Sequence, residues 1–251
     1  MPLASNFLNS SSNTNKILLY GVPKSKKTWW TGLIAGLGYN LHYFDIEQGL
    51  IILKNLPKEY LSKINILDIA DVNSIPIAFN FIDKFLSSKS TSFYYNEVTK
   101  RESKDGVLIQ PNKLTSSDVI IIDSYTALVD SVINSYKLAT NKNMSSPEDF
   151  DWNFYRWAQT ALNDLIRNFM SLPCHVIFIA HEQKTDIIKN KQITGFEISI
   201  ASSSFKHSKS LARFFSDILY FSIEPPAEVD VSTALTDKRL GGSRIREPWK
   251  K

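Results

Sequence analysis

The sequence lacks several features that would place it in a specialised class of protein. It has one cysteine, Cys174, among 251 residues, which excludes an internal disulfide and favours a reducing compartment. No apolar run approaches the ~20 residues that a membrane-spanning helix needs. We therefore expect a cytoplasmic protein that does not contact a membrane.

Neither sign of charge dominates the chain. Lys and Arg number 29 and Asp and Glu number 25, giving a net charge of +4, which permits an anionic partner without demanding one. The first residues lack the basic start and the apolar stretch of a signal peptide. No internal repeat and no second core is visible, so we expect a disordered leader over 1–15, one domain over 16–224 and a basic tail over 225–251.

Short apolar runs alternate with helical patterns inside the expected domain. The expected strands are 16–20, 41–46, 64–69, 118–122, 174–180 and 217–223. The expected helices are 27–37, 75–88, 125–138, 147–171 and 205–214. The strand runs are apolar almost throughout, as strands covered on both faces are. Together these patterns predict an α/β fold with a mostly parallel central sheet and helices on both faces.

The connections and the longest helix give further expectations. Residues 89–117 are predicted to be a loop that holds a small hairpin, and residues 183–204 are predicted to be a loop. Ser146 and Pro147 suit the start of the helix expected over 147–171. Its apolar face repeats every three or four residues, so its Trp and Phe side chains are expected in the core.

A glycine is missing from the stretch "GVPKSKKT", which follows the first expected strand. Gly21, Lys27 and Thr28 match the phosphate-binding pattern Gly-x4-Gly-Lys-Ser/Thr, but Lys26 stands at the second glycine. Such a loop binds phosphates with backbone N–H groups at a helix N-terminus, with a lysine and with a hydroxyl for Mg²⁺. The motif alone favours a nucleotide site and a basic surface turn about equally. The predicted nucleotide-binding residues are Gly21, Val22, Pro23, Lys24, Ser25, Lys26, Lys27 and Thr28.

Lys26 admits two interpretations. The residue before the lysine commonly adopts a backbone conformation that glycine tolerates best, so a side chain there costs about 1 kcal/mol. The loop either retains nucleotide binding with a useful extra charge or binds poorly as a degenerate site. We favour retained binding, because the other polar groups that such a site needs are present.

Polar side chains follow three of the expected strands. They are Asp45 and Glu47, then Asp123 and Ser124, then His181 and Glu182. In open α/β sheets ligands bind at the carboxyl ends of the strands. We therefore expect these groups to lie beside the phosphate loop.

Four motifs in this order resemble those of the RecA-like P-loop ATPases: "GVPKSKKT", "FDIEQGL", "VIIIDS" and "HVIFIAHE". The resemblance extends over residues 16–223 and, with the compact size and the "AHE", is greatest to phage- or virus-encoded RecA-like nucleotide-binding proteins, some of which act in single-strand annealing and recombination. Asp123-Ser124 lacks a second acidic residue, which points away from the AAA+ ATPases and helicases.

The resemblance implies ATP and Mg²⁺ as ligands and a role for each site residue. Lys27 would contact the β- and γ-phosphates, and Thr28 with Asp123 would hold Mg²⁺. Glu47 would orient and polarise the attacking water. His181 would sense the γ-phosphate. The candidate catalytic residues are therefore Glu47, Lys27 and His181.

In RecA-like proteins the region after the sensor strand contacts single-stranded DNA. Here the basic residues of that region are Lys184, Lys189, Lys191, Lys206, Lys209 and Arg213, and Phe196 and Phe205 are candidates for stacking on bases. A solvated loop is the alternative, as is a contact with the γ-phosphate of a neighbouring subunit. The resemblance allows a homo-oligomeric ring or filament. The absence of a sequence-reading motif favours sequence-independent binding.

Three functions remain open from the sequence. The first is a Mg²⁺-dependent ATPase acting on single-stranded DNA in phage or viral recombination or replication, in the host cytoplasm. The second, which Lys26 favours, is a weakly or non-hydrolysing regulator or scaffold. The third is a packaging motor, for which a second acidic residue beside Asp123 would be expected.

Overall fold

The structure is a computed structural model that describes residues 14–87, 93–94, 108–140, 152–189, 192–202 and 205–223. Contacts divide the chain into Met1–Phe221 and Ser222–Lys251. Every helix and strand described below belongs to the first unit. Residues 1–13 of the expected leader and the whole expected tail lie outside the described residues.

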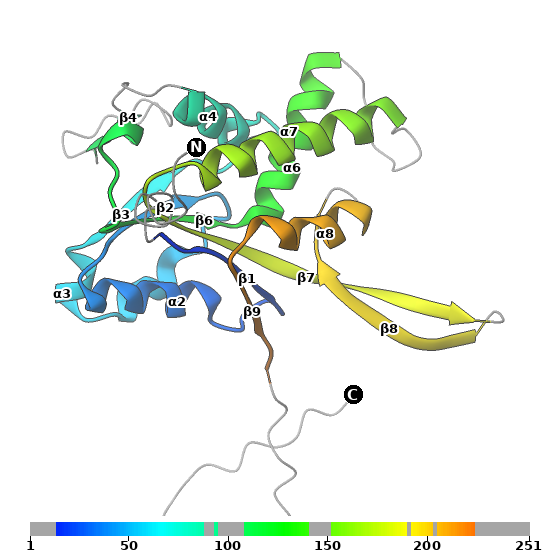
Figure 1. Cartoon of the computed structure of the whole chain (residues 1–251), viewed down its shortest axis with the longest axis horizontal. Helices are drawn as coiled ribbons and strands as arrows, with labels where there is room; N and C mark the ends of the chain where they lie inside the picture. The colour runs from blue at the N-terminus through cyan, green and yellow to red at the C-terminus, as the bar shows by residue number, and fades with distance from the viewer. Residues whose placement is uncertain are drawn as a thin grey trace, which may run out of the picture. The chain divides into compact units, whose positions relative to one another are not determined.

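A seven-stranded sheet forms the centre of the first unit (Figure 1). Six strands lie side by side in the order β3-β2-β6-β7-β1-β9, and all five neighbouring pairs are parallel. Their bounds are β1 Lys16–Gly21, β2 Asn40–Asp45, β3 Ile64–Asp68, β6 Asp118–Asp123, β7 His175–Lys189 and β9 Asp217–Phe221. The prediction of a mostly parallel central sheet is confirmed.

Helices cover both faces of this sheet, as predicted (Figure 1). One face packs against α4 (Ile77–Ser87), α6 (Tyr125–Thr140), α7 (Trp152–Met170), α8 (Phe205–Leu211) and the 3-10 helix η5 (Ala212–Phe214). The other packs against α2 (Lys27–Gly32), η1 (Leu33–Leu37), η2 (Leu50–Asn55) and α3 (Lys58–Leu61). Adjacent residues such as Leu18 and Leu19 enter opposite cores, which explains why the strands are apolar at successive positions.

The helices follow the expected pattern with local differences. The expected helix 27–37 is α2 followed by η1, because the chain tightens to 3-10 geometry after Gly32. In α7 Phe154 and Phe169 are buried, but Trp157 is 36% exposed and packs against Phe79 at the surface. The expected cap at residues 146 and 147 lies outside the described residues. Among the helices described, none is long and apolar enough to cross a membrane.

The prediction of a loop over 183–204 is wrong. β7 continues to Lys189 and pairs antiparallel with β8 (Gln192–Ile200), so a long hairpin extends from the sheet (Figure 1). The sequence of β8 alternates apolar with polar residues in "FEISI", which is typical of a strand with one covered face. The small hairpin expected within 89–117 is confirmed: β4 (Phe93–Tyr94) pairs with β5 (Leu108–Ile109), before η3 (Pro111–Lys113).

Gly21 marks the point where β1 and β9 approach most closely. Its φ is +147°, and a Cβ added there would lie 1.9 Å from the carbonyl oxygen of Phe221. The neighbouring N–H of Val22 donates to that same oxygen at 3.3 Å. Only glycine lets the chain leave the sheet here without displacing the backbone of β9.

We therefore predict that Gly21→Ala lowers the free energy of unfolding by about 3 kcal/mol, from overpacking and left-handed backbone strain together. Urea unfolding measures this. Gly49→Ala is the matched control, because a Cβ there meets no atom within 4 Å and φ is −92°. Equal stabilities of the two variants would contradict the close approach at Gly21.

Candidate functional site

The loop between β1 and α2 contains two lysines in left-handed backbone conformation. Lys24 has φ of 64° and Lys26 has φ of 66°, and the side chains of both are exposed. The carbonyl of Lys26 accepts a hydrogen bond from the N–H of Trp30 at 2.9 Å, so Lys26 is the residue from which α2 begins. Lys26 thus adopts the glycine-like conformation expected of this position, which costs about 1–2 kcal/mol for a residue with a side chain.

Lys27 lies inside this loop. Its side chain is buried, and Nζ donates to the carbonyl oxygens of Gly21 at 3.1 Å and Val22 at 2.9 Å. Burial lowers the pKa of Lys27, while the negative charges of Asp123 and Glu47 act in the opposite direction. The ammonium is therefore held at the carboxyl end of β1 with acidic groups facing it.

Thr28 and Asp123 are joined by a short hydrogen bond. The Thr28 hydroxyl donates to Asp123 Oδ2 at 2.7 Å, and Asp123 is only 4% exposed. Burial raises the pKa of Asp123 to about 6, although the hydrogen bond from Thr28 lowers it. A hydroxyl and a carboxylate are the hard oxygen ligands that Mg²⁺ prefers, and one or two of them with substrate phosphates are its usual set. The donor atoms present here fit that ion.

Glu47 is held by two side chains from neighbouring strands. His181 Nε2 lies 3.0 Å from Glu47 Oε1 and 3.2 Å from Oε2, and the Ser124 hydroxyl donates to Oε1. Burial raises the pKa of Glu47, but the hydrogen bonds from His181 and Ser124 and the charge of Lys27 outweigh it, so the pKa is lowered. Glu47 is thus an oriented carboxylate that is ionised at neutral pH and still reaches solvent.

The backbone of β2 and β6 brings these groups together. Asp45 pairs in register with Asp123, and the carbonyl of Asp123 accepts hydrogen bonds from the N–H groups of Ile46 at 2.7 Å and Glu47 at 3.3 Å. The turn after β2 therefore lies across the end of β6. The structure places Lys27, Thr28, Asp123, Glu47 and His181 in one contiguous cluster, as the sequence predicted for the strand ends.

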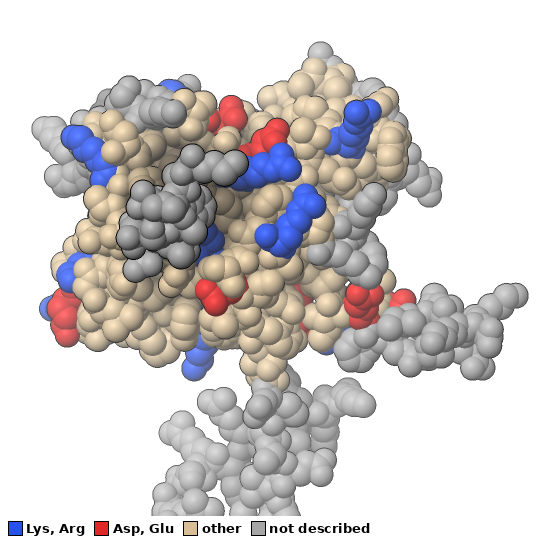
Figure 2. Space-filling model, viewed as in Figure 1, with Lys and Arg blue, Asp and Glu red and all other residues tan. Residues whose placement is uncertain are grey.

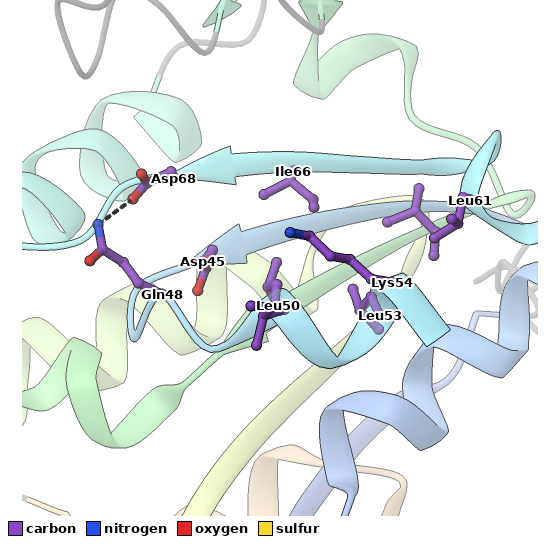
Figure 3. A pocket seen from close by; sticks show the side chains of 10 residues that line it. Asp45, Gln48, Leu50, Leu53, Lys54, Leu61, Ile66 and Asp68 are labelled. Atoms are coloured by element: carbon purple, nitrogen blue, oxygen red, sulfur yellow. Dashed lines mark hydrogen bonds between the residues drawn. The ribbon is translucent and has the colours of Figure 1, made fainter. Parts of the chain in front are cut away.

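Glu182 and Asp45 lie apart from this cluster. Glu182 Oε2 accepts a hydrogen bond from the Tyr220 hydroxyl at 2.7 Å, on the side of β9. Asp45 lines a groove of about 630 Å³ between β3 and η2, where Gln48 Nε2 donates to Asp68 at 3.3 Å (Figure 3). Burial, with the charge of Asp123, raises the pKa of Asp45 to about 7. Sequence reasoning missed this groove, since its walls come from separate segments.

Two further side chains were also missed. The Thr126 hydroxyl accepts a hydrogen bond from the N–H of His181 at 3.0 Å, which fixes the sensor strand against α6. The Tyr43 hydroxyl lies 2.8 Å from the Thr31 hydroxyl, which steadies α2 against β2. Thr126 follows the Asp123-Ser124 motif directly, so its position was visible, but its partner 55 residues away was not.

The candidate DNA-contacting residues are dispersed. The Lys184 side chain is exposed and lies 3.7 Å from Glu182, and the Arg213 guanidinium stacks over the ring of Phe214. Lys189 belongs to β7, and Lys206 and Lys209 belong to α8; Lys191 lies outside the described residues. On the face drawn in Figure 2 the basic side chains form separate groups with acidic ones between them.

Comparisons with known proteins give one family and two distant structural likenesses. The chain matches the AAA domain family over residues 13–240. No curated protein matches it. An ATPase from the type III secretion system of pathogenic bacteria aligns at 10% identity and a TM-score of 0.40, with 83% of this chain and 51% of that chain covered. A second solved structure, the ATPase domain of another protein, aligns at 12% identity and a TM-score of 0.40, with 86% and 79% covered. This chain therefore spans about half the length of the secretion ATPase.

The family match overturns the expectation that the chain stands apart from the AAA families. That expectation rested on the missing second acidic residue beside Asp123. In the structure a carboxylate reaches the end of β6 from β2 instead, since Glu47 bonds to Ser124. The match covers most of the sequence, so the chain belongs to the AAA domain family and is a P-loop ATPase domain of the AAA type.

Proposed function

We propose that this protein is a Mg²⁺-dependent ATPase whose turnover responds to single-stranded DNA. One observation supports the chemistry most strongly. The buried ammonium of Lys27, the Thr28–Asp123 pair and the ionised carboxylate of Glu47 meet at the carboxyl end of the sheet. Phosphoryl transfer needs positioning and charge neutralisation more than covalent catalysis, and these groups provide both.

Each residue has a separate part in the proposed reaction. The N–H groups of the loop and the N-terminus of α2 face the phosphates, and Lys27 neutralises charge on the β- and γ-phosphate oxygens. Thr28 and Asp123 would hold Mg²⁺, which when bound neutralises charge on the same oxygens.

Glu47 is the proposed general base. Its lowered pKa keeps it ionised at neutral pH, so it accepts a hydrogen bond from the attacking water and takes up the proton as the bond to phosphorus forms. Ser124 and His181 orient its two oxygens. We assign His181 the additional role of sensing the γ-phosphate, since it links Glu47 to the strand beside the phosphate loop.

The proposed DNA contact is the hairpin of β7 and β8. It continues the strand that holds His181, and its exposed Lys184 offers a cation for a phosphate. The setting in phage or viral recombination or replication rests on the sequence resemblance alone.

One observation favours a second function, a regulator that binds nucleotide and hydrolyses little. Lys26 places a side chain at a left-handed position directly before the phosphate-binding lysine. A displaced loop would bind ATP without aligning it for attack by water.

The roles of Lys27 and Glu47 predict opposite mutant behaviour. Lys27→Ala should abolish ATP binding measured by calorimetry, because the buried cation of the loop is lost. Glu47→Gln should keep the binding and lower turnover by about 100-fold or more, because only the base is removed. Lys84→Ala, an exposed lysine on α4, is the control and should change neither quantity. Retained turnover in Glu47→Gln would exclude Glu47 as the base.

Lys26→Gly tests the altered glycine position. We expect ATP affinity to fall about tenfold, because a charge-assisted contact with phosphate contributes about 1.5–3 kcal/mol. The free energy of unfolding should not fall, since glycine relieves left-handed strain of about 1 kcal/mol. Lys24→Gly is the matched control, an exposed left-handed lysine of the same loop. Unchanged or higher affinity in Lys26→Gly would identify Lys26 as a tolerated loss.

The DNA response is tested by ATP turnover with and without a poly-dT oligonucleotide. We expect turnover to rise several-fold with the oligonucleotide, and Lys184→Ala to reduce the increase. Higher salt should suppress it, as for other contacts with phosphate. ATP binding with no turnover under either condition would support the regulator, and turnover that ignores the oligonucleotide would remove DNA from the proposal.

A further inference from the structure

Four residues close a ring of hydrogen bonds around the proposed base. Ser124 donates to Glu47, and Glu47 lies 3.0 Å from His181 Nε2. The N–H of His181 donates to the Thr126 hydroxyl at 3.0 Å, and Thr126 returns to Ser124 through the first turn of α6. The position of Glu47 thus depends on how the start of α6 is held.

A second ring shares His181 and Thr126 with the first. The carbonyl of His181 accepts a hydrogen bond from the N–H of Ala201 at 2.9 Å, where the chain returns from β8. The next residue, Ser202, places its hydroxyl 3.0 Å from the hydroxyl of Tyr125, which lies between Ser124 and Thr126. The base of the hairpin is therefore tied to the residue between the two that hold Glu47 and His181.

A buried histidine extends this second ring to two more helices. His207 Nδ1 on α8 lies 2.7 Å from the Ser202 hydroxyl and 3.3 Å from the Tyr125 hydroxyl. Its Nε2 lies 3.3 Å from Asn163 Oδ1 on α7. Burial lowers the pKa of His207 to about 4, so the ring is neutral at neutral pH. Nδ1 then accepts from a hydroxyl while Nε2–H donates to Asn163.

We propose that Tyr125 and His207 are positioning residues for Glu47. They anchor the first turn of α6 to the hairpin base and to α8, and that turn holds Glu47 through Ser124 and His181 through Thr126. The inference rests on the proposed function, in which Glu47 activates water. It adds that a buried polar network outside the nucleotide site sets the rate of that step.

The hydroxyl of Tyr125 is a clean point of intervention. Tyr125 is fully buried, and its ring lies 5.9 Å from that of Phe178, measured between centroids. Phenylalanine keeps this packing and removes only the link to Ser202 and His207. Ser131→Ala is the matched control: Ser131 is also fully buried on α6 and bonds to Asp71 at 2.8 Å, outside both rings.

The first measurement separates kcat from KM in the full chain. Tyr125→Phe should lower kcat about tenfold at saturating ATP, because small displacements of a catalytic group are costly. The KM for ATP should stay near that of the wild type, since Lys27 and Thr28 are untouched. Ser131→Ala should keep the wild-type kcat even if both variants lose similar stability in thermal unfolding. Equal kcat values in the two variants would overturn the inference.

Two substitutions of His207 provide the rescue. His207→Asn keeps a polar group close to the position of Nδ1, facing Ser202 and Tyr125, and His207→Leu removes it. We expect the asparagine variant to retain most of the kcat and the leucine variant to resemble Tyr125→Phe. Equal loss of kcat in both, at equal stability, would show that His207 serves packing and not position.

A second measurement does not depend on turnover. Hydrogen exchange should be about tenfold faster at the amides of His181 and Ala201 in Tyr125→Phe than in Ser131→Ala, because both amides lie in the rings that Tyr125 closes. If the wild type binds ATP but does not hydrolyse it, the proposed function fails on that result, and exchange decides the inference by itself. Unchanged exchange at both amides would overturn it.

Discussion

The parallel pairing of β2 with β6 is the constraint on which the candidate site depends. It sets Asp45 beside Asp123 and lets the carbonyl of Asp123 hold the N–H groups of Ile46 and Glu47. A slip of one residue would turn Asp123 toward the opposite core, away from Thr28. The apolar residues on both faces of β6 forbid that slip, so core packing fixes the geometry of the polar groups at the strand ends.

Much of the fold was predictable, because parallel strands buried on both faces carry an unbroken apolar run. The six expected strands appear within one or two residues of their predicted starts, and the site residues follow them. The phosphate loop was also predictable, since its parts are contiguous between Gly21 and Thr28. Even the strained conformation of Lys26 followed from the position that it occupies in the motif.

The rest could not be predicted, because it depends on contacts between distant segments. β8 and the outer half of β7 carry lysines, an aspartate and a glycine, which weaken the strand signal, and only their mutual pairing stabilises them. The carboxylate beside Asp123 comes from Glu47 on another strand, which led the sequence comparison away from the AAA families. The network around Tyr125 joins residues up to 82 positions apart.

The neighbours of β1 have a consequence for how the molecule comes into being. In the described part of the sheet β1 pairs with β7 and β9, which lie more than 150 residues later in the chain. Contacts of such long sequence separation form slowly, because a large loop must close first. During synthesis from the N-terminus, the phosphate loop is made among the first segments and finds its sheet partners among the last. Until then β1 has two open edges, which invite pairing with other chains. The nascent protein thus carries its most exposed aggregation hazard beside the loop on which the proposed activity depends.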